Sequence, residues 1–106
     1  MTEAERTSLY ERAIKCFGSE AQENLCIEEC AELIQAINKK HRRIPHNISE
    51  EIADVEITLE QLKIINRCQE EIERIKTDKL SRLSMIVDIG EAIKNDSNTT
   101  DRAALH

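Results

Sequence analysis

Five acidic side chains are spaced so that they could bind a cation together. Glu28, Glu29 and Glu32 lie in the segment LCIEECAELIQAI, and Glu51 and Asp54 lie in the later segment EIAD. At about 100° of rotation per residue, the three glutamates would share an arc of about 100° on a helix, and Glu51 and Asp54 would lie one turn apart. No Lys or Arg stands three or four positions from any of the five. Like charges at this spacing repel by roughly a few tenths of a kcal/mol, so we expect a bound cation to offset the repulsion.

The alternative is that these acids form an ordinary solvated helix face, as acidic residues usually do. Solvated faces normally interleave charges of both signs. The chain does this later, where Glu70 stands four residues before Arg74 and Glu73 three before Lys76. The five acids lack such neighbours, and this difference favours a binding site.

Oxygen ligands favour a hard cation, and we therefore expect Mg²⁺, with Mn²⁺ as a possible substitute. A di-iron site in a helical bundle would require Glu-x-x-His pairs on two helices, and the sequence has none. A zinc site made by Cys26, Cys30, His41 and His46 is conceivable, but this spacing matches no zinc-finger pattern. Buried cysteines that pack as small apolar residues are the more common case.

The acids must be positioned by helices, because apolar residues recur at helical spacing between a few breaking residues. Gly18 and Pro45 are expected to end the first and second helices. Ser19 is a plausible N-cap, and Asn47 and Glu50 have the spacing of a capping box. The predicted helices cover residues 3–16, 19–43, 47–67 and 69–94.

The composition predicts an all-α protein with one four-helix bundle-like domain over residues 1–94 and a flexible tail over residues 95–106. Only 2% of the 106 residues are aromatic, so we expect self-association to complete the core. The net charge of −6 argues against nucleic-acid binding, which requires clustered basic residues. No apolar stretch suggests an export signal or a membrane span, so we expect a cytoplasmic protein with reduced cysteines.

The two acidic segments carry a resemblance to a known family. EECAE followed by EIAD resembles the metal motif EExxE…ExxD of the all-α, MazG-like nucleoside triphosphate pyrophosphohydrolases. The longer segments GSEAQENLCIEECAELIQAINK and EEIADVEITLEQLKII are similar to small, single-domain members from phages and Gram-positive bacteria, often described as dATP/dGTP pyrophosphohydrolases. The similarity covers residues 10–83, most of the predicted domain.

The resemblance implies a reaction and a division of roles. A nucleoside triphosphate, with a purine deoxynucleotide as the expected substrate, would be hydrolysed to the monophosphate and pyrophosphate, with Mg²⁺ held by the five acids as catalytic and metal-binding residues. Lys79 and Arg82, in KTDKLSRL, resemble the family's phosphate-binding element, although an ordinary solvated pair near Asp78 is an open alternative. Independently of the resemblance, Lys39 lies two helical turns beyond Glu32 on the same arc and is a weaker phosphate-binding candidate, although a basic residue there is more often an ordinary helix-end charge.

The resemblance also implies a homodimer or homotetramer, but Glu56 and Glu60 stand where longer family members are often apolar, which leaves the mode of assembly open. Gln22, Thr58 and Gln61 could contact a base, but polar residues on helices usually face solvent, and we assign them no role. The competing functional hypothesis is a non-catalytic interaction module whose acidic face binds a basic protein partner.

Overall fold

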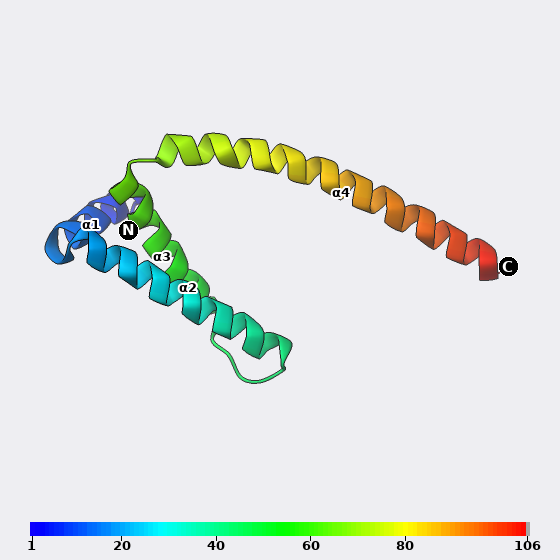
Figure 1. The fold of residues 1–106 in the computed structure, drawn as a ribbon, viewed down its shortest axis with the longest axis horizontal. Helices are drawn as coiled ribbons and strands as arrows, with labels where there is room; N and C mark the ends of the chain where they lie inside the picture. Colours follow the sequence, from blue (N-terminus) through cyan, green and yellow to red (C-terminus); the bar gives the residue numbers. More distant parts are fainter. Residues whose placement is uncertain (106) are drawn as a thin grey trace. The chain divides into compact units, whose positions relative to one another are not determined.

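The computed structural model describes the backbone of residues 1–105 and the side chains of residues 1–97. Over this part of the chain there are four helices and no strand, so the predicted all-α class is confirmed. The helices are α1 (Glu3–Phe17), α2 (Ser19–His41), α3 (Ile48–Asn66) and α4 (Gln69–Leu105) (Figure 1). The chain divides into two units, one of which is Met1–Cys68 with α1, α2 and α3, while the other begins at Gln69 and contains α4.

Gly18 makes the break between α1 and α2. Its φ of 93° lies in a region that a residue without a Cβ adopts at little cost. Gly18 ends α1 and also occupies the N-cap position of α2, where no side chain caps the helix. The prediction that Ser19 is the cap is therefore wrong, because Ser19 is already the first helical residue of α2.

The connection from α2 to α3 contains Pro45, as expected, but α2 ends at His41 rather than at residue 43. Arg43 adopts a left-handed conformation with a φ of 59°, which continues no helix. Asn47 occupies the N-cap position of α3 without a side-chain capping bond. The predicted capping box with Glu50 is therefore wrong, because the Asn47 amide instead donates a hydrogen bond to Glu51.

The first unit is built on an antiparallel pair, α2 and α3, with α1 in contact with both (Figure 1). The seam between α2 and α3 holds few buried apolar side chains, namely Cys26, Ala36 and Val55. It holds more buried polar side chains than apolar ones, namely Gln22, Glu51, Thr58 and Gln61. Polar side chains are seldom buried in such numbers without hydrogen-bond partners, so the seam is more polar than an ordinary helical core.

The second unit is a single helix, α4, which continues without interruption through Gly90. The predicted end of this helix at residue 94 is wrong, because α4 extends to Leu105. Its apolar residues from Ile75 onward are exposed, including Leu80, Leu83, Ile86 and Ile89. Packing of this helix in a bundle, the domain limit at residue 94, and self-association all stay predictions. The expected flexible tail, residues 95–106, falls mostly outside the side chains that the structure describes, and its flexibility likewise stays a prediction.

No helix among the described residues has the length and apolar character that a membrane span requires.

Candidate metal centre

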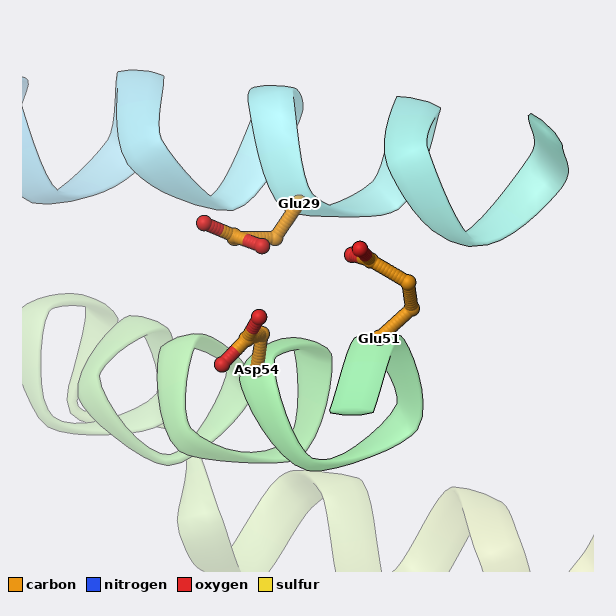
Figure 2. A group of neighbouring side chains, drawn as sticks. All are labelled: Glu29, Glu51 and Asp54. Atoms are coloured by element: carbon orange, nitrogen blue, oxygen red, sulfur yellow. The ribbon is translucent and has the colours of Figure 1, made fainter. Parts of the chain in front are cut away.

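Three of the five predicted acids converge in the seam between α2 and α3. Glu29 extends from α2, and Glu51 and Asp54 extend from α3, so that their carboxylates point toward one another (Figure 2). One oxygen from each residue lies within 4.8 Å of the others. The local reason is helical spacing, since Glu51 and Asp54 are three residues apart on the face of α3 that meets α2. These three residues are hereafter called the acidic triad.

The environment of the acidic triad disfavours three negative charges. Glu51 is only 7% exposed, and Glu29 and Asp54 are half-buried. Burial raises the pKa of the Glu29 carboxyl above its ordinary value, and the negative charges of Glu32, Asp54 and Glu51 raise it further. Without a cation, burial and the neighbouring carboxylates therefore make the negative charge of Glu29 unfavourable.

No basic side chain within the described part of the chain neutralises the acidic triad. The ion pairs found there join Lys63 to Glu60 and Lys76 to Glu73, away from the three carboxylates. Oxygens of two triad members, Glu29 Oε2 and Glu51 Oε2, are buried and have no hydrogen-bond partner. Buried carboxylate oxygens without partners are costly in free energy, which points to an additional positively charged ligand.

Asn47 holds one side of Glu51. Its amide Nδ2 donates a hydrogen bond to Glu51 Oε1 at 2.7 Å, across one helical turn at the start of α3. The bond leaves Glu51 Oε2 as the oxygen without a partner. Partners of this kind orient a metal-binding carboxylate and fix which oxygen faces the metal.

The donor set fits Mg²⁺ or Mn²⁺. At Mg–O distances of about 2.1 Å, adjacent ligands of an octahedral Mg²⁺ are about 3.0 Å apart and opposite ligands about 4.2 Å apart. The three oxygens lie within 4.8 Å of one another, so their side chains would have to rotate closer together to share one ion directly. All three donors are carboxylates, which suits a hard cation. The zinc alternative finds no support, because no group of potential metal ligands found among the described residues includes Cys26, Cys30, His41 or His46.

The remaining predicted site residues do not join the acidic triad. Glu28 and Glu32 are exposed on α2, although Glu32 is close enough to Glu29 to raise its pKa. Lys39 is exposed in the last turn of α2. Lys79 and Arg82 are exposed on α4, in the second unit. Their roles in metal or phosphate binding stay predictions.

The structure draws attention to two residues that sequence reasoning gave no part in the site. Asn47 was expected only to cap α3, although its position four residues before Glu51 was a usable signal. Gln61 was expected to face solvent, whereas it is 6% exposed and its Oε1 lacks a partner. Gln61 stands seven residues after Asp54, which is the spacing that keeps two helical residues on one face.

When the chain is compared with known proteins, no family model, curated protein or solved structure matches it. The MazG-like resemblance thus depends on the two acidic motifs and their flanking segments, and the site depends on the geometry of Glu29, Glu51 and Asp54.

Proposed function

We propose that this chain is a Mg²⁺-dependent nucleoside triphosphate pyrophosphohydrolase. It would hydrolyse a nucleoside triphosphate, with a purine deoxynucleotide as the expected substrate, to the monophosphate and pyrophosphate. The single observation that supports this most strongly is Glu51, which is more than nine-tenths buried and directs an unpartnered carboxylate oxygen into a cluster of two further acids. The MazG-like motif connects such a cluster to triphosphate hydrolysis.

The acidic triad would hold the metal, and Asn47 would keep Glu51 in position. Mg²⁺ held by these carboxylates would supply positive charge to neutralise the phosphates and would orient a water molecule for attack at the α-phosphorus. The chain itself supplies carboxylates on two packed helices, whose rigid backbones keep the donors close together. It also excludes basic residues from the triad, so a triphosphate would be repelled unless metal is present.

Glu28 and Glu32 complete the proposed acidic set on α2. Lys79, Arg82 and, less strongly, Lys39 are the proposed phosphate-binding residues. The roles of Lys79 and Arg82 come from the resemblance, whereas Lys39 is proposed because it stands seven residues, two helical turns, beyond Glu32 on α2. Each assignment can be tested by replacement of the single side chain.

We also propose that the protein acts as a homodimer or homotetramer in the cytoplasm. The first unit exposes Ile27 and Ile34 to 67% and 61%, and both line an open groove of about 560 Å³ beside Cys26, Cys30 and Leu62. Exposed aliphatic side chains that gather around a groove are typical of surfaces covered in an assembly.

The experiment that tests the function is pyrophosphate release from a panel of nucleoside triphosphates, with and without Mg²⁺. We expect turnover only with Mg²⁺ or Mn²⁺. Asp54→Asn should lower kcat/KM by about a hundredfold or more, because metal-mediated charge stabilisation contributes several kcal/mol and each 1.36 kcal/mol is tenfold. Glu32→Gln tests in the same assay whether Glu32, which lies outside the acidic triad, is also required for turnover.

Glu56→Gln is the matched control, since Glu56 is exposed on α3 two residues beyond Asp54. Its turnover should equal that of the unmodified chain, and circular dichroism should show that all variants keep their helices. Turnover that survives Asp54→Asn unchanged would reject the site. No turnover of any nucleotide, and no response to Mg²⁺, would instead favour the interaction-module hypothesis.

A further inference from the structure

Polar side chains continue along the seam beyond the acidic triad. Thr58 and Gln61 are 4% and 6% exposed on α3, and Gln22 is 8% exposed on α2. On α3 they follow Glu51 and Val55 at the spacing of one continuous helix face. The acidic triad is thus one part of a longer strip of buried polar side chains. The second part of the strip consists of Thr58, Gln61 and Gln22, which have no role in the proposed metal binding.

The register of α2 and α3 places the residues of the second part on the same side of the acidic triad along the seam. Gln61 stands seven residues after Asp54, and Gln22 stands seven residues before Glu29. Seven residues are two helical turns, about 10.5 Å along the axis, with a rotation of about 20°. Because α2 and α3 are antiparallel (Figure 1), both steps lead the same way along the seam. A ligand anchored at the triad and extending along the seam would meet these residues next.

The hydrogen-bonding state of Thr58 and Gln61 defines what such a ligand must offer. Gln61 Oε1 is buried without a partner, so it lacks a hydrogen-bond donor. Thr58 uses its hydroxyl hydrogen to donate to the Val55 carbonyl at 2.9 Å, which leaves only its lone pairs available. The two side chains are three residues apart on α3, so their acceptors are neighbours. The strip therefore calls for a group with N–H donors.

We propose that Gln61 and Thr58 recognise the exocyclic amine of the substrate's base, with Gln22 facing them from α2. This inference depends on the proposed function, because the triphosphate at the acidic triad brings the base to the strip. Adenine is the fullest match, since a glutamine amide can accept from its N6 amine and donate to its N7. Hypoxanthine and uracil present a carbonyl where adenine and cytosine present the amine. The oxygens of Gln61 and Thr58 would then face another hydrogen-bond acceptor and stay without a donor.

Two substrate pairs test the inference, dATP with dITP and dCTP with dUTP, because each pair exchanges the amine for a carbonyl. We expect the amine-bearing member of any hydrolysed pair to have a kcat/KM at least about tenfold higher, the effect of a buried acceptor that stays unpaired. Gln61→Met, which keeps the length of the side chain and removes the acceptor, should lower that ratio by about tenfold. Thr58→Val, which has the same shape as threonine, should lower it by a smaller factor.

The variants are designed so that loss of folding does not imitate the result. Gln61→Met removes a buried polar group without a partner, so the variant should keep its helices and resist urea at least as well as the unmodified chain. Gln35→Met is the matched control, since Gln35 is exposed on α2 and should leave the ratio unchanged. Measuring a ratio within one variant also cancels any difference in the folded fraction.

The possible outcomes distinguish failure of the base-recognition inference from failure of the proposed hydrolase function. Equal rates for both members of each pair, or a ratio unchanged by Gln61→Met and Thr58→Val, would overturn the inference while Mg²⁺-dependent hydrolysis still stood. Absence of hydrolysis for all four nucleotides would overturn the proposed function, and the base-recognition role would be rejected with it.

Discussion

Replacing Glu51 by glutamine should make the metal-free protein more stable and remove its response to Mg²⁺. Glu51 is buried beside Asp54 and Glu29, and its Oε2 has no partner. Glutamine has nearly the same shape and keeps an amide oxygen that can accept the hydrogen bond from Asn47. The substitution therefore removes a negative charge while leaving the packing nearly unchanged.

The expected gain in the free energy of unfolding follows from the repulsion between Glu51 and Asp54. The triad's oxygens lie within 4.8 Å of one another, and two carboxylates at that limiting distance repel by about 3.5 kcal/mol at an effective dielectric constant of about 20. Asp54 is half-buried, so salt and nearby water screen part of this repulsion. We expect the free energy of unfolding of Glu51→Gln in EDTA to exceed that of the unmodified chain by about 1–2 kcal/mol.

The assay is urea unfolding followed by circular dichroism, first in EDTA and then with saturating Mg²⁺. The unmodified chain should gain stability on addition of Mg²⁺, because a ligand that binds only the folded state shifts the unfolding equilibrium. Glu50→Gln is the matched control, since Glu50 is also in the first turn of α3 but exposed. It loses the same favourable interaction with the helix dipole, worth about 0.3–1 kcal/mol, without relieving the triad.

The difference in stability between the two proteins should therefore change between the two conditions. Glu51→Gln is expected to be the more stable protein in EDTA, and the unmodified chain is expected to gain on it when Mg²⁺ is added. A Glu51→Gln protein that is less stable than the control in EDTA, and that keeps the full response to Mg²⁺, would refute the electrostatic reasoning about the triad.

Three further predictions concern the support, the protonation and the assembly of the site. Asn47→Ala should weaken Mg²⁺ binding by about 10–100-fold in calorimetry through loss of the bond that orients Glu51, whereas Asn38→Ala, at an exposed position, should not. In EDTA, the raised pKa of Glu29 means that the folded state binds the Glu29 proton more tightly than the unfolded state does, so this proton stabilises the fold fully below the ordinary pKa of 4.5 and the stabilisation is lost as pH rises through the folded pKa. Glu29→Gln should therefore make the urea midpoint depend less on pH across that range. An unchanged pH profile would contradict the assignment. Ile27→Glu with Ile34→Glu should lower the mass found by sedimentation to that of the monomer, and an unchanged mass would exclude this face from the assembly.

Much of the fold follows from short-range rules that operate within a few residues. Gly18 and Pro45 fall in the breaks between helices, and the four helices occur in the predicted order. The pairing of Glu51 with Asp54 on one face likewise requires only the helical repeat. These features depend on backbone geometry that is local in sequence, which is why they could be predicted.

The choice among the three glutamates of α2 could not be predicted in the same way. Glu28, Glu29 and Glu32 share a broad arc, and the rotation of α2 about its axis decides which of them faces α3. That rotation is determined by packing of the whole seam, and it places Glu29 opposite Asp54 and leaves Glu28 exposed. Tertiary packing supplies this information, and no local pattern contains it.

Asn47 and Gln61 show why polar residues are the hardest to place from sequence. Asn47 could cap α3 through its side-chain oxygen or donate to Glu51 through its amide nitrogen, and only the bond to Glu51 is present. The charged acceptor forms the stronger hydrogen bond. Gln61 was expected on the surface because glutamine usually is, and burial of Gln61 follows from a seam that is polar along its length.

The most direct test of the account is a crystal structure of the protein with Mn²⁺ and a non-hydrolysable nucleoside triphosphate analogue, read from the anomalous signal of the metal. We predict a manganese peak between the carboxylates of Glu29, Glu51 and Asp54, with phosphate oxygens of the analogue on the same ion. Carboxylates turned apart toward solvent, with no metal between them in a crystal that contains the analogue, would contradict it.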